Sequence, residues 1–158
     1  MKHAVIYLGS GFPSQMRILR EALGYTPEWS PVMPIVSRPI ADEQELSRIL
    51  ELLDRLTQGS HWDPQIMAQP DENSVPRLTF EAAMVSVRAN EALHDFLLER
   101  SLDEKDLLVR AADKPRCWLI AVHSPEGGIP PGLGFVVDKH SSIAMSRRWI
   151  DVVPLLEE

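Results

Sequence analysis

The spacing of apolar residues along the chain predicts several helices followed by a run of strands. Apolar positions three or four apart recur over residues 42–58 and 80–100, which is the periodicity of helices with a buried face. From residue 116 onward the pattern changes to short β-prone runs separated by turn-forming residues. The expected elements are strand 4–8, helix 14–23, edge strand 32–36, helix 42–58, helix 80–100, short helix 101–111, strands 116–123 and 133–138, and one bent or two short strands over 143–153.

This order of elements predicts an α+β fold. Consecutive strands joined by short links favour antiparallel pairing, because parallel strands need long crossover connections. We therefore expect a single domain, 1–158, in which an antiparallel sheet (strand one plus three or four C-terminal strands) packs against about four helices. Residues 57–78 show no periodicity and are rich in polar residues and proline, so they predict a long loop of a kind that is often functional.

The charge of the chain disfavours two classes of partner. The 158 residues have a formal net charge of −7 and a sequence pI of about 5.2. Binding to nucleic acids depends on Lys and Arg that neutralise phosphates, so no direct contact with nucleic acid is expected, and anionic membranes are disfavoured for the same reason. No apolar run approaches the ~20 residues of a membrane span, and the first one is too short for a signal peptide. The single cysteine, Cys117, is typical of a reducing compartment, so we expect a cytoplasmic protein.

The sequence shows no motif that would hold a cofactor or perform catalysis. The run that begins at Gly9 lacks the third glycine of a dinucleotide-binding fingerprint, because Ser14 occupies that position. Cys117 and His123 lie on one predicted strand, about 20 Å apart, and so cannot form a catalytic dyad. The five histidines do not have the spacing of a zinc site. We therefore expect no cofactor and no metal, and an enzyme is the less favoured function.

Four polar residues at predicted loops and strand ends form an alternative candidate site: His123, Asp138, His140 and Arg147. Imidazole and carboxylate groups can exchange protons with a substrate, and a guanidinium group can hold a phosphate or carboxylate. This interpretation predicts a small enzyme or ligand-binding domain with a polar pocket. The simpler interpretation is that polar residues are common at the edges of loops.

The acidic residues are concentrated in one part of the chain. Residues 42–72 contain eight acidic and two basic residues, a balance of −6 within the total of −7. Trp62 lies among them, and an aromatic anchor surrounded by carboxylates suits a basic protein surface. A solvated helix face followed by a polar loop is the simpler interpretation. The candidate partner-binding residues are Glu43, Glu51, Asp54, His61, Trp62, Asp63, Asp71 and Glu72.

These features favour a small acidic protein-binding module over an enzyme. The profile is typical of an inhibitor that sterically blocks a basic surface of a toxin, a nuclease or a defence complex. Immunity proteins, antitoxins and anti-defence proteins of bacteria and phages are examples, and the excess of Arg over Lys hints at such a source. A third interpretation is a homo-oligomer, such as a homodimer, in which the Pro-rich segment pairs across subunits as an edge strand.

Overall fold

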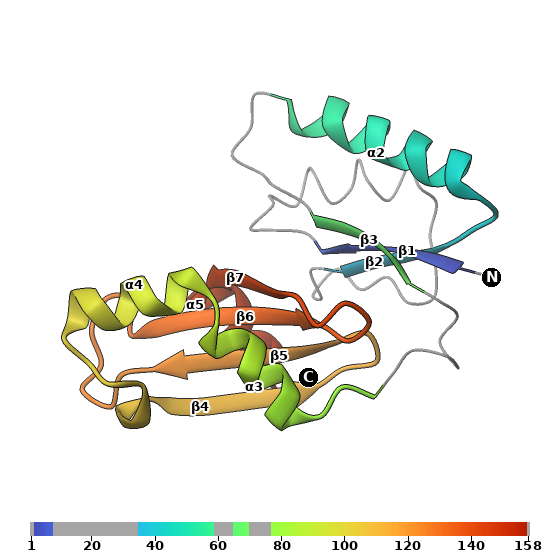
Figure 1. Cartoon of the computed structure of the whole chain (residues 1–158). Coiled ribbons are helices and arrows are strands. Elements are labelled where there is room, and N and C mark those ends of the chain that lie inside the picture. The colour runs from blue at the N-terminus through green and yellow to red at the C-terminus, as the bar shows by residue number, and fades with distance from the viewer. Residues whose placement is uncertain (1, 8–34, 59–64, 70–76, 158) are drawn as a thin grey trace. The chain divides into compact units, whose positions relative to one another are not determined.

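The computed structural model describes residues 2–7, 35–58, 65–69 and 77–157 (Figure 1). It contains two compact units, Met1–Ser74 and Val75–Glu158, and each is described here by itself. The α+β class is confirmed, because the C-terminal strands form an antiparallel sheet and the helices are separate from them in the chain order. The expectation of one domain spanning 1–158 stays a prediction. None of the described helices is long and apolar enough to cross a membrane.

The N-terminal unit has a sheet of its own, which corrects the expectation that strand one joins the C-terminal strands. β1 (Lys2–Tyr7) lies between β2 (Ile35–Ile40) and β3 (Gln65–Gln69), and both pairs are antiparallel. β3 lies within the segment that was expected to be a long loop. The sequence did not predict this strand because its short run is flanked by polar residues and contains few β-branched residues. β2 includes Pro39 and is an edge strand, where proline is tolerated.

The helix of the N-terminal unit is α2 (Glu43–Thr57), and its start agrees with the sequence. The Asp42 side chain accepts a hydrogen bond from the backbone N–H of Glu45 (2.9 Å), and the Glu45 carboxylate accepts one from the backbone N–H four residues earlier (2.7 Å). Ile49 and Leu53 are buried one turn apart. This capping box and apolar stripe fix which side of α2 faces solvent.

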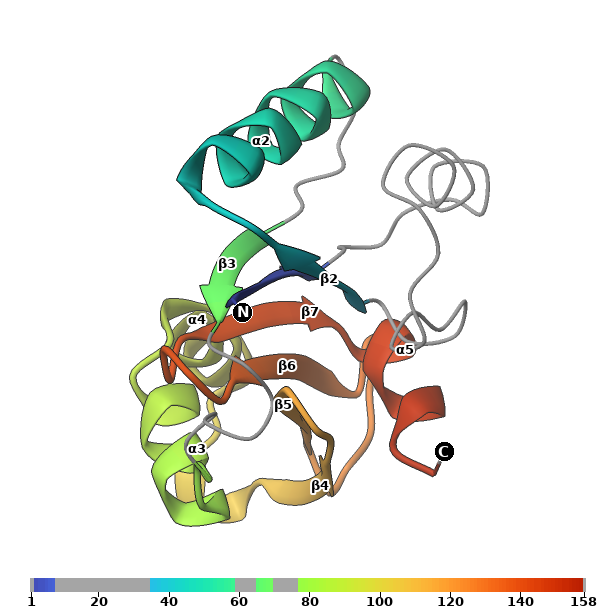
Figure 2. The same ribbon diagram turned by 90° about the vertical axis from the view of Figure 1, so that its right-hand side faces the viewer.

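The sheet of the C-terminal unit has four strands in sequence order: β4 (Leu108–Asp113), β5 (Cys117–His123), β6 (Gly132–Asp138) and β7 (Ala144–Arg148). All neighbouring pairs are antiparallel, as the short links between them predicted (Figure 2).

Two expectations for the C-terminal unit were wrong. β4 lies where a short helix was expected, because Ser101 has the left-handed conformation (φ 52°) that ends a helix rather than capping a new one. Only a 3-10 turn, η2 (Glu104–Asp106), precedes the strand. At the other end, α5 (Trp149–Val152) and the 3-10 turn η3 (Val153–Leu155) replace the last expected strand.

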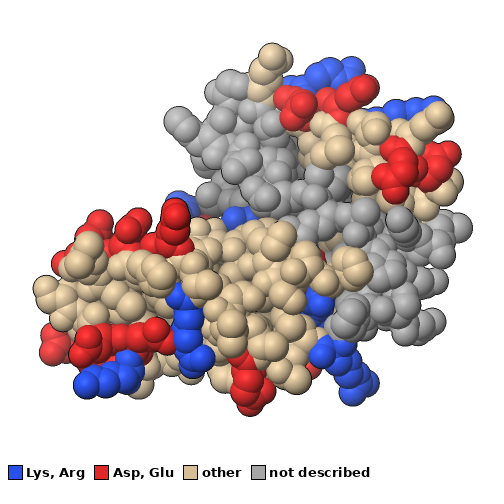
Figure 3. Space-filling model, viewed as in Figure 1, with Lys and Arg blue, Asp and Glu red and all other residues tan. Residues whose placement is uncertain are grey.

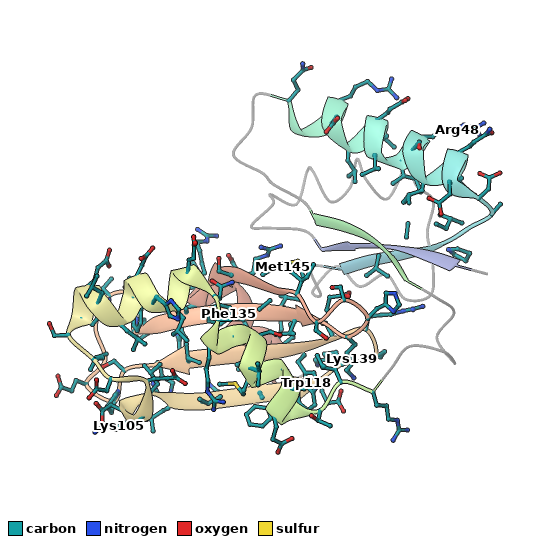
Figure 4. The ribbon with its side chains drawn as sticks, viewed as in Figure 1. Arg48, Lys105, Trp118, Phe135, Lys139 and Met145 are labelled. Carbon is teal, nitrogen blue, oxygen red and sulfur yellow. The ribbon has the colours of Figure 1, made fainter. Side chains whose placement is uncertain are left out.

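The core of the C-terminal unit lies on both faces of the β5–β6 pair. On one face Ile120, Val122, Phe135 and Val137 pack with apolar residues of the helices α3 (Phe80–Arg88) and α4 (Glu91–Arg100), and Figure 4 shows Phe135 among these side chains. On the other face a Cβ at Gly134 would lie 2.4 Å from the Val152 side chain, so only glycine lets α5 approach so closely. A strand pair buried on both faces explains the continuous apolar runs in the sequence.

Residues 80–100 form two helices instead of the expected one: α3 (Phe80–Arg88) and α4 (Glu91–Arg100). Asn90 has an extended backbone between them, and its side-chain oxygen accepts a hydrogen bond from the backbone N–H of Ala92 (2.9 Å). Its side-chain NH2 group donates to the carbonyl oxygen of Ala144 on β7 (3.0 Å). One side chain therefore both starts α4 and ties the break between the helices to the sheet.

The two hydrogen bonds of Asn90 predict the effect of replacing it. Asn90→Ala removes the cap and the bond to β7, and should lower the free energy of unfolding by about 1–3 kcal/mol. Asn90→Asp keeps an acceptor for the cap but loses the donor, so its loss should be intermediate. Urea denaturation followed by circular dichroism measures both variants. Wild-type stability in Asn90→Ala would contradict this role.

Candidate functional site

Three of the eight residues predicted to bind a partner are described, and all three are exposed on α2: Glu43, Glu51 and Asp54. The other five lie outside the described residues: His61, Trp62, Asp63, Asp71 and Glu72. Arg48 and Arg55 are also exposed on α2, and Figure 3 shows both signs of charge on this helix. The N-terminal position of Glu43 complements the helix dipole, which is a structural role. The described part of the predicted patch is therefore a face of mixed charge.

A second set of carboxylates lies on α4, and sequence reasoning missed it. Glu91, Asp95 and Glu99 are spaced four residues apart and all are exposed, so they form one line along the outer side of the helix. We call these three residues the acidic row. None of them forms an ion pair with another described residue, and Figure 3 shows Asp and Glu side chains along α4. The sequence reasoning had used only the apolar positions of residues 80–100, so this polar line on the same segment was overlooked.

The basic side chains next to the acidic row have other partners. Arg88 forms an ion pair with Glu104 (Nε–Oε1 2.6 Å). Arg100 donates a hydrogen bond to the carbonyl oxygen of Pro130 (2.6 Å), and its guanidinium lies over the ring of Phe96 (5.0 Å to the centroid). Both guanidinium groups therefore have partners other than the row, and within the described part of the chain no ion pair offsets the row's negative charge.

Leu98 adds an apolar group to the same surface of α4. It is 82% exposed and lies between Asp95 and Glu99 in the chain. A single exposed leucine is common on protein surfaces. Here it stands beside carboxylates on a helix whose opposite side is held in the core by Leu93 and Phe96. The surface therefore combines a fixed backbone, an apolar contact and a row of charges of one sign, which are the features of a protein-binding surface.

The sheet does not bring together the four residues of the alternative pocket. His123 and Asp138 lie at opposite ends of the β5–β6 ladder, six residues apart, which corresponds to about 20 Å. Arg147 on β7 lies toward the His123 end, and His140 follows Asp138 at the other end. The register thus divides the set into two separate pairs.

Several of these polar residues have structural contacts where they stand. Asp138 is fully buried and accepts hydrogen bonds from the backbone N–H groups of His140 (3.1 Å) and Ser141 (2.7 Å), which stabilises the turn after β6. The ring of His123 packs edge-on against Trp149, with ring centroids 5.1 Å apart. Asp138 and His123 therefore each have a structural contact within the protein.

A third cluster, around Trp118 on β5, also has a structural role. The indole N–H donates to the carbonyl oxygen of Leu78 (2.6 Å), and the ring packs edge-on against Phe80 (5.9 Å between centroids). Lys139 lies over the same ring, 5.7 Å from its centroid, and forms an ion pair with Asp113 (Figure 4). Trp118 thereby holds the start of α3 against the sheet. Its only polar atom, the indole nitrogen, is hydrogen-bonded to Leu78.

The thiol of Cys117 and the candidate metal ligands were the remaining chemical groups of interest among the described residues. Burial, reinforced by the charge of Asp138, raises the pKa of the Cys117 thiol to about 12, so the thiol is neutral at physiological pH. Within the part of the chain that is described, no three His, Cys, Asp or Glu side chains gather so as to hold a metal ion. The glycine run at residues 9–11 lies outside the described residues.

Comparison with protein-family models, curated proteins and solved structures gives no match to this chain. Its function is therefore argued from its own residues.

The raised pKa of Cys117 predicts an unreactive thiol. A disulfide reagent such as DTNB at pH 8 should not label the folded protein and should label it fully in urea. The pKa of this thiol is about 12 in the folded protein and 9.0 ordinarily, so the unfolded chain ionises it at a lower pH than the folded protein does. The contribution of the protonated thiol to the free energy of unfolding is therefore fully present below pH 9 and is lost as the pH rises toward 12. Rapid labelling of the folded protein at pH 8 would show that the thiol is accessible.

Proposed function

We propose that this protein is a small acidic binding protein that sterically blocks a basic surface of another protein. The acidic row of α4 is the observation that supports this proposal best, and Glu51 and Asp54 on α2 supply further exposed carboxylates. Partners of suitable chemistry are a toxin, a nuclease or a defence complex whose own surface is rich in Lys and Arg. An immunity, antitoxin or anti-defence role in the bacterial or phage cytoplasm is part of the proposal.

The stability cost of the acidic row supports a role in binding. Like charges four residues apart on a helix repel by about 0.2–0.5 kcal/mol for each pair, and the row has two such pairs. A substitution at Asp95 alone would relieve both. Groups that reduce stability are commonly retained where function needs them. A partner with Lys or Arg opposite the row would convert this repulsion into attraction.

The mechanism needs no catalytic group. Negative charge along α4 would speed the encounter with a positive surface and orient it, because steering by opposite charges acts over about a Debye length. Leu98 would then make the close apolar contact. Since Leu93 and Phe96 hold α4 against the sheet, little ordering would be needed on binding. The alternative, a small enzyme or ligand-binding domain, has less support because the register separates its four polar residues.

Two triple variants of equal charge test whether the location of the carboxylates matters. In one, the three residues of the acidic row become Lys; in the other, the exposed residues Glu81, Asp106 and Glu126, for which no ion pair with a described residue is seen, become Lys. Each variant raises the formal net charge by six, from −7 to −1. Immobilised wild-type protein is used to recover a partner from extracts of the source organism, and the partner's affinity for each variant is measured at several salt concentrations.

The proposal predicts that the row variant loses binding and that the control variant keeps most of it. A third variant, Glu51→Lys with Asp54→Lys, reports whether α2 also contributes, and should weaken binding and its salt dependence if it does. Equal weakening by the two triple variants would mean that only bulk charge matters. Unchanged binding by the row variant would remove α4 from the mechanism.

The acidic row also predicts a change of stability that needs no partner. Asp95→Lys replaces two repulsive pairs by two attractive ones, with Glu91 and with Glu99, and lysine has the higher helix propensity. The free energy of unfolding should therefore rise by about 1 kcal/mol at low salt, with a smaller gain at 1 M NaCl because salt screens the pairs. Thermal and urea denaturation measure it. A destabilised variant would indicate that Asp95 has a structural role.

A further inference from the structure

The outer edge of β4 is an unpaired strand edge. β4 is the first strand of the four-stranded sheet and, among the described residues, pairs only with β5, as Figure 1 shows. Leu108 and Val109 are 49% and 40% exposed, and Ala111 is exposed as well. Its six residues pair with β5 in a continuous register without a bulge. A regular edge of this kind is a template for another strand.

The hydrogen-bond pattern shows which backbone groups point outward. The backbone N–H of Lys114 donates to the carbonyl oxygen of Cys117 (3.0 Å), so these two residues form a hydrogen-bonded pair in the β4–β5 register. Such pairs alternate along an antiparallel ladder, so residues 108, 110 and 112 direct their backbone groups to β5. Val109, Ala111 and Asp113 therefore direct three N–H and three C=O groups away from the sheet.

β2 and β7, which are also edge strands, have features that oppose pairing with a second copy. β2 includes a proline, Pro39, which removes one backbone donor. β7 ends with two arginines, Arg147 and Arg148, and leads directly into α5. β4 has neither a proline nor two like charges, since its charged residues are Arg110 and Asp113. Its edge is the one among these three without such a device.

We propose that a second copy of this chain pairs antiparallel with the outer edge of β4, about a two-fold axis at Ala111. In this register Ala111 lies opposite its own copy, and Val109 lies opposite Asp113 of the other copy. All six outward backbone groups of each strand then have partners, and each face of the sheet continues into the second copy.

Repulsion between like charges disfavours the two neighbouring registers, in which the two-fold axis would lie at residue 110 or 112 instead of 111. Arg110 forms an ion pair with Glu157 of its own chain (Nη2–Oε1 3.1 Å). Pairing about position 110 would still bring two of these guanidinium groups face to face in a close, non-hydrogen-bonded pair, and pairing about position 112 would place Arg110 opposite Lys114. Pairing about position 111 places Arg110 opposite Ala112, which has no charge. Like charges directly opposite destabilise a strand pair, so the self-complementary register is the one centred on Ala111. The dimer does not depend on the proposed function, because the acidic row lies on α4.

Sedimentation equilibrium of the full chain tests the proposal with two matched variants. Wild type should reach twice the 17.8 kDa monomer mass as its concentration rises. Ala111→Lys places two ammonium groups together at the axis and should abolish the dimer, while the exposed side chain leaves the monomer fold intact. Ala89→Lys makes the same change at an exposed position on the end of α3 and should remain dimeric.

A cysteine variant tests the register directly. Residues in a hydrogen-bonded antiparallel pair have Cα atoms about 5.5 Å apart, within the range of a disulfide. Ala111→Cys with an added thiol oxidant should therefore give a covalent dimer, whereas Ala89→Cys should not, and the buried Cys117 thiol adds no background. A monomeric wild type at all concentrations, a dimeric Ala111→Lys variant, or equal cross-linking of the two cysteine variants would overturn the proposal.

Discussion

The burial of both faces of the β5–β6 pair is the constraint on which the C-terminal unit depends. Ile120 and Phe135 are fully buried under α3 and α4, while Gly134 lets α5 lie close on the opposite face. Covering one face with two short helices requires a break between them, which Asn90 provides and anchors to β7. Among the surfaces that this packing leaves uncovered in the described residues are the outer side of α4 and the outer edge of β4.

These two uncovered surfaces differ in chemistry, and so they suit different partners. The outer side of α4 has three carboxylates of like charge and one exposed leucine, which together suit a basic protein surface. The outer edge of β4 offers the outward-pointing backbone groups of Val109, Ala111 and Asp113, which suit another strand. A protein that sterically blocks a partner, as proposed, needs only such surfaces on a well-packed support.

The sequence predicted the parts of the fold where local signals and tertiary packing agree. The capping box of Asp42 and Glu45 marked the start of α2, and the apolar runs around Ile120 and Val136 marked β5 and β6. It missed the break at Asn90 because apolar positions continue on both sides of it, and it missed β4 because Ser101 resembles a helix cap. The partners of β1 come from segments with weak β signals. The acidic row was hidden within an apolar helix, although the four-residue spacing of its carboxylates was visible in the sequence.

Site-specific photo-crosslinking from α4 tests the binding account most directly. Leu98, the 82% exposed residue in the last turn of α4, would be replaced by the photoreactive residue benzoylphenylalanine, and the protein irradiated in extracts of the source organism. Val85, also exposed but on α3, provides the matched control position. The account predicts a distinct adduct from position 98 with a protein rich in Lys and Arg, lost at high salt and absent from position 85. The same adducts from both positions, or none from position 98, would contradict it.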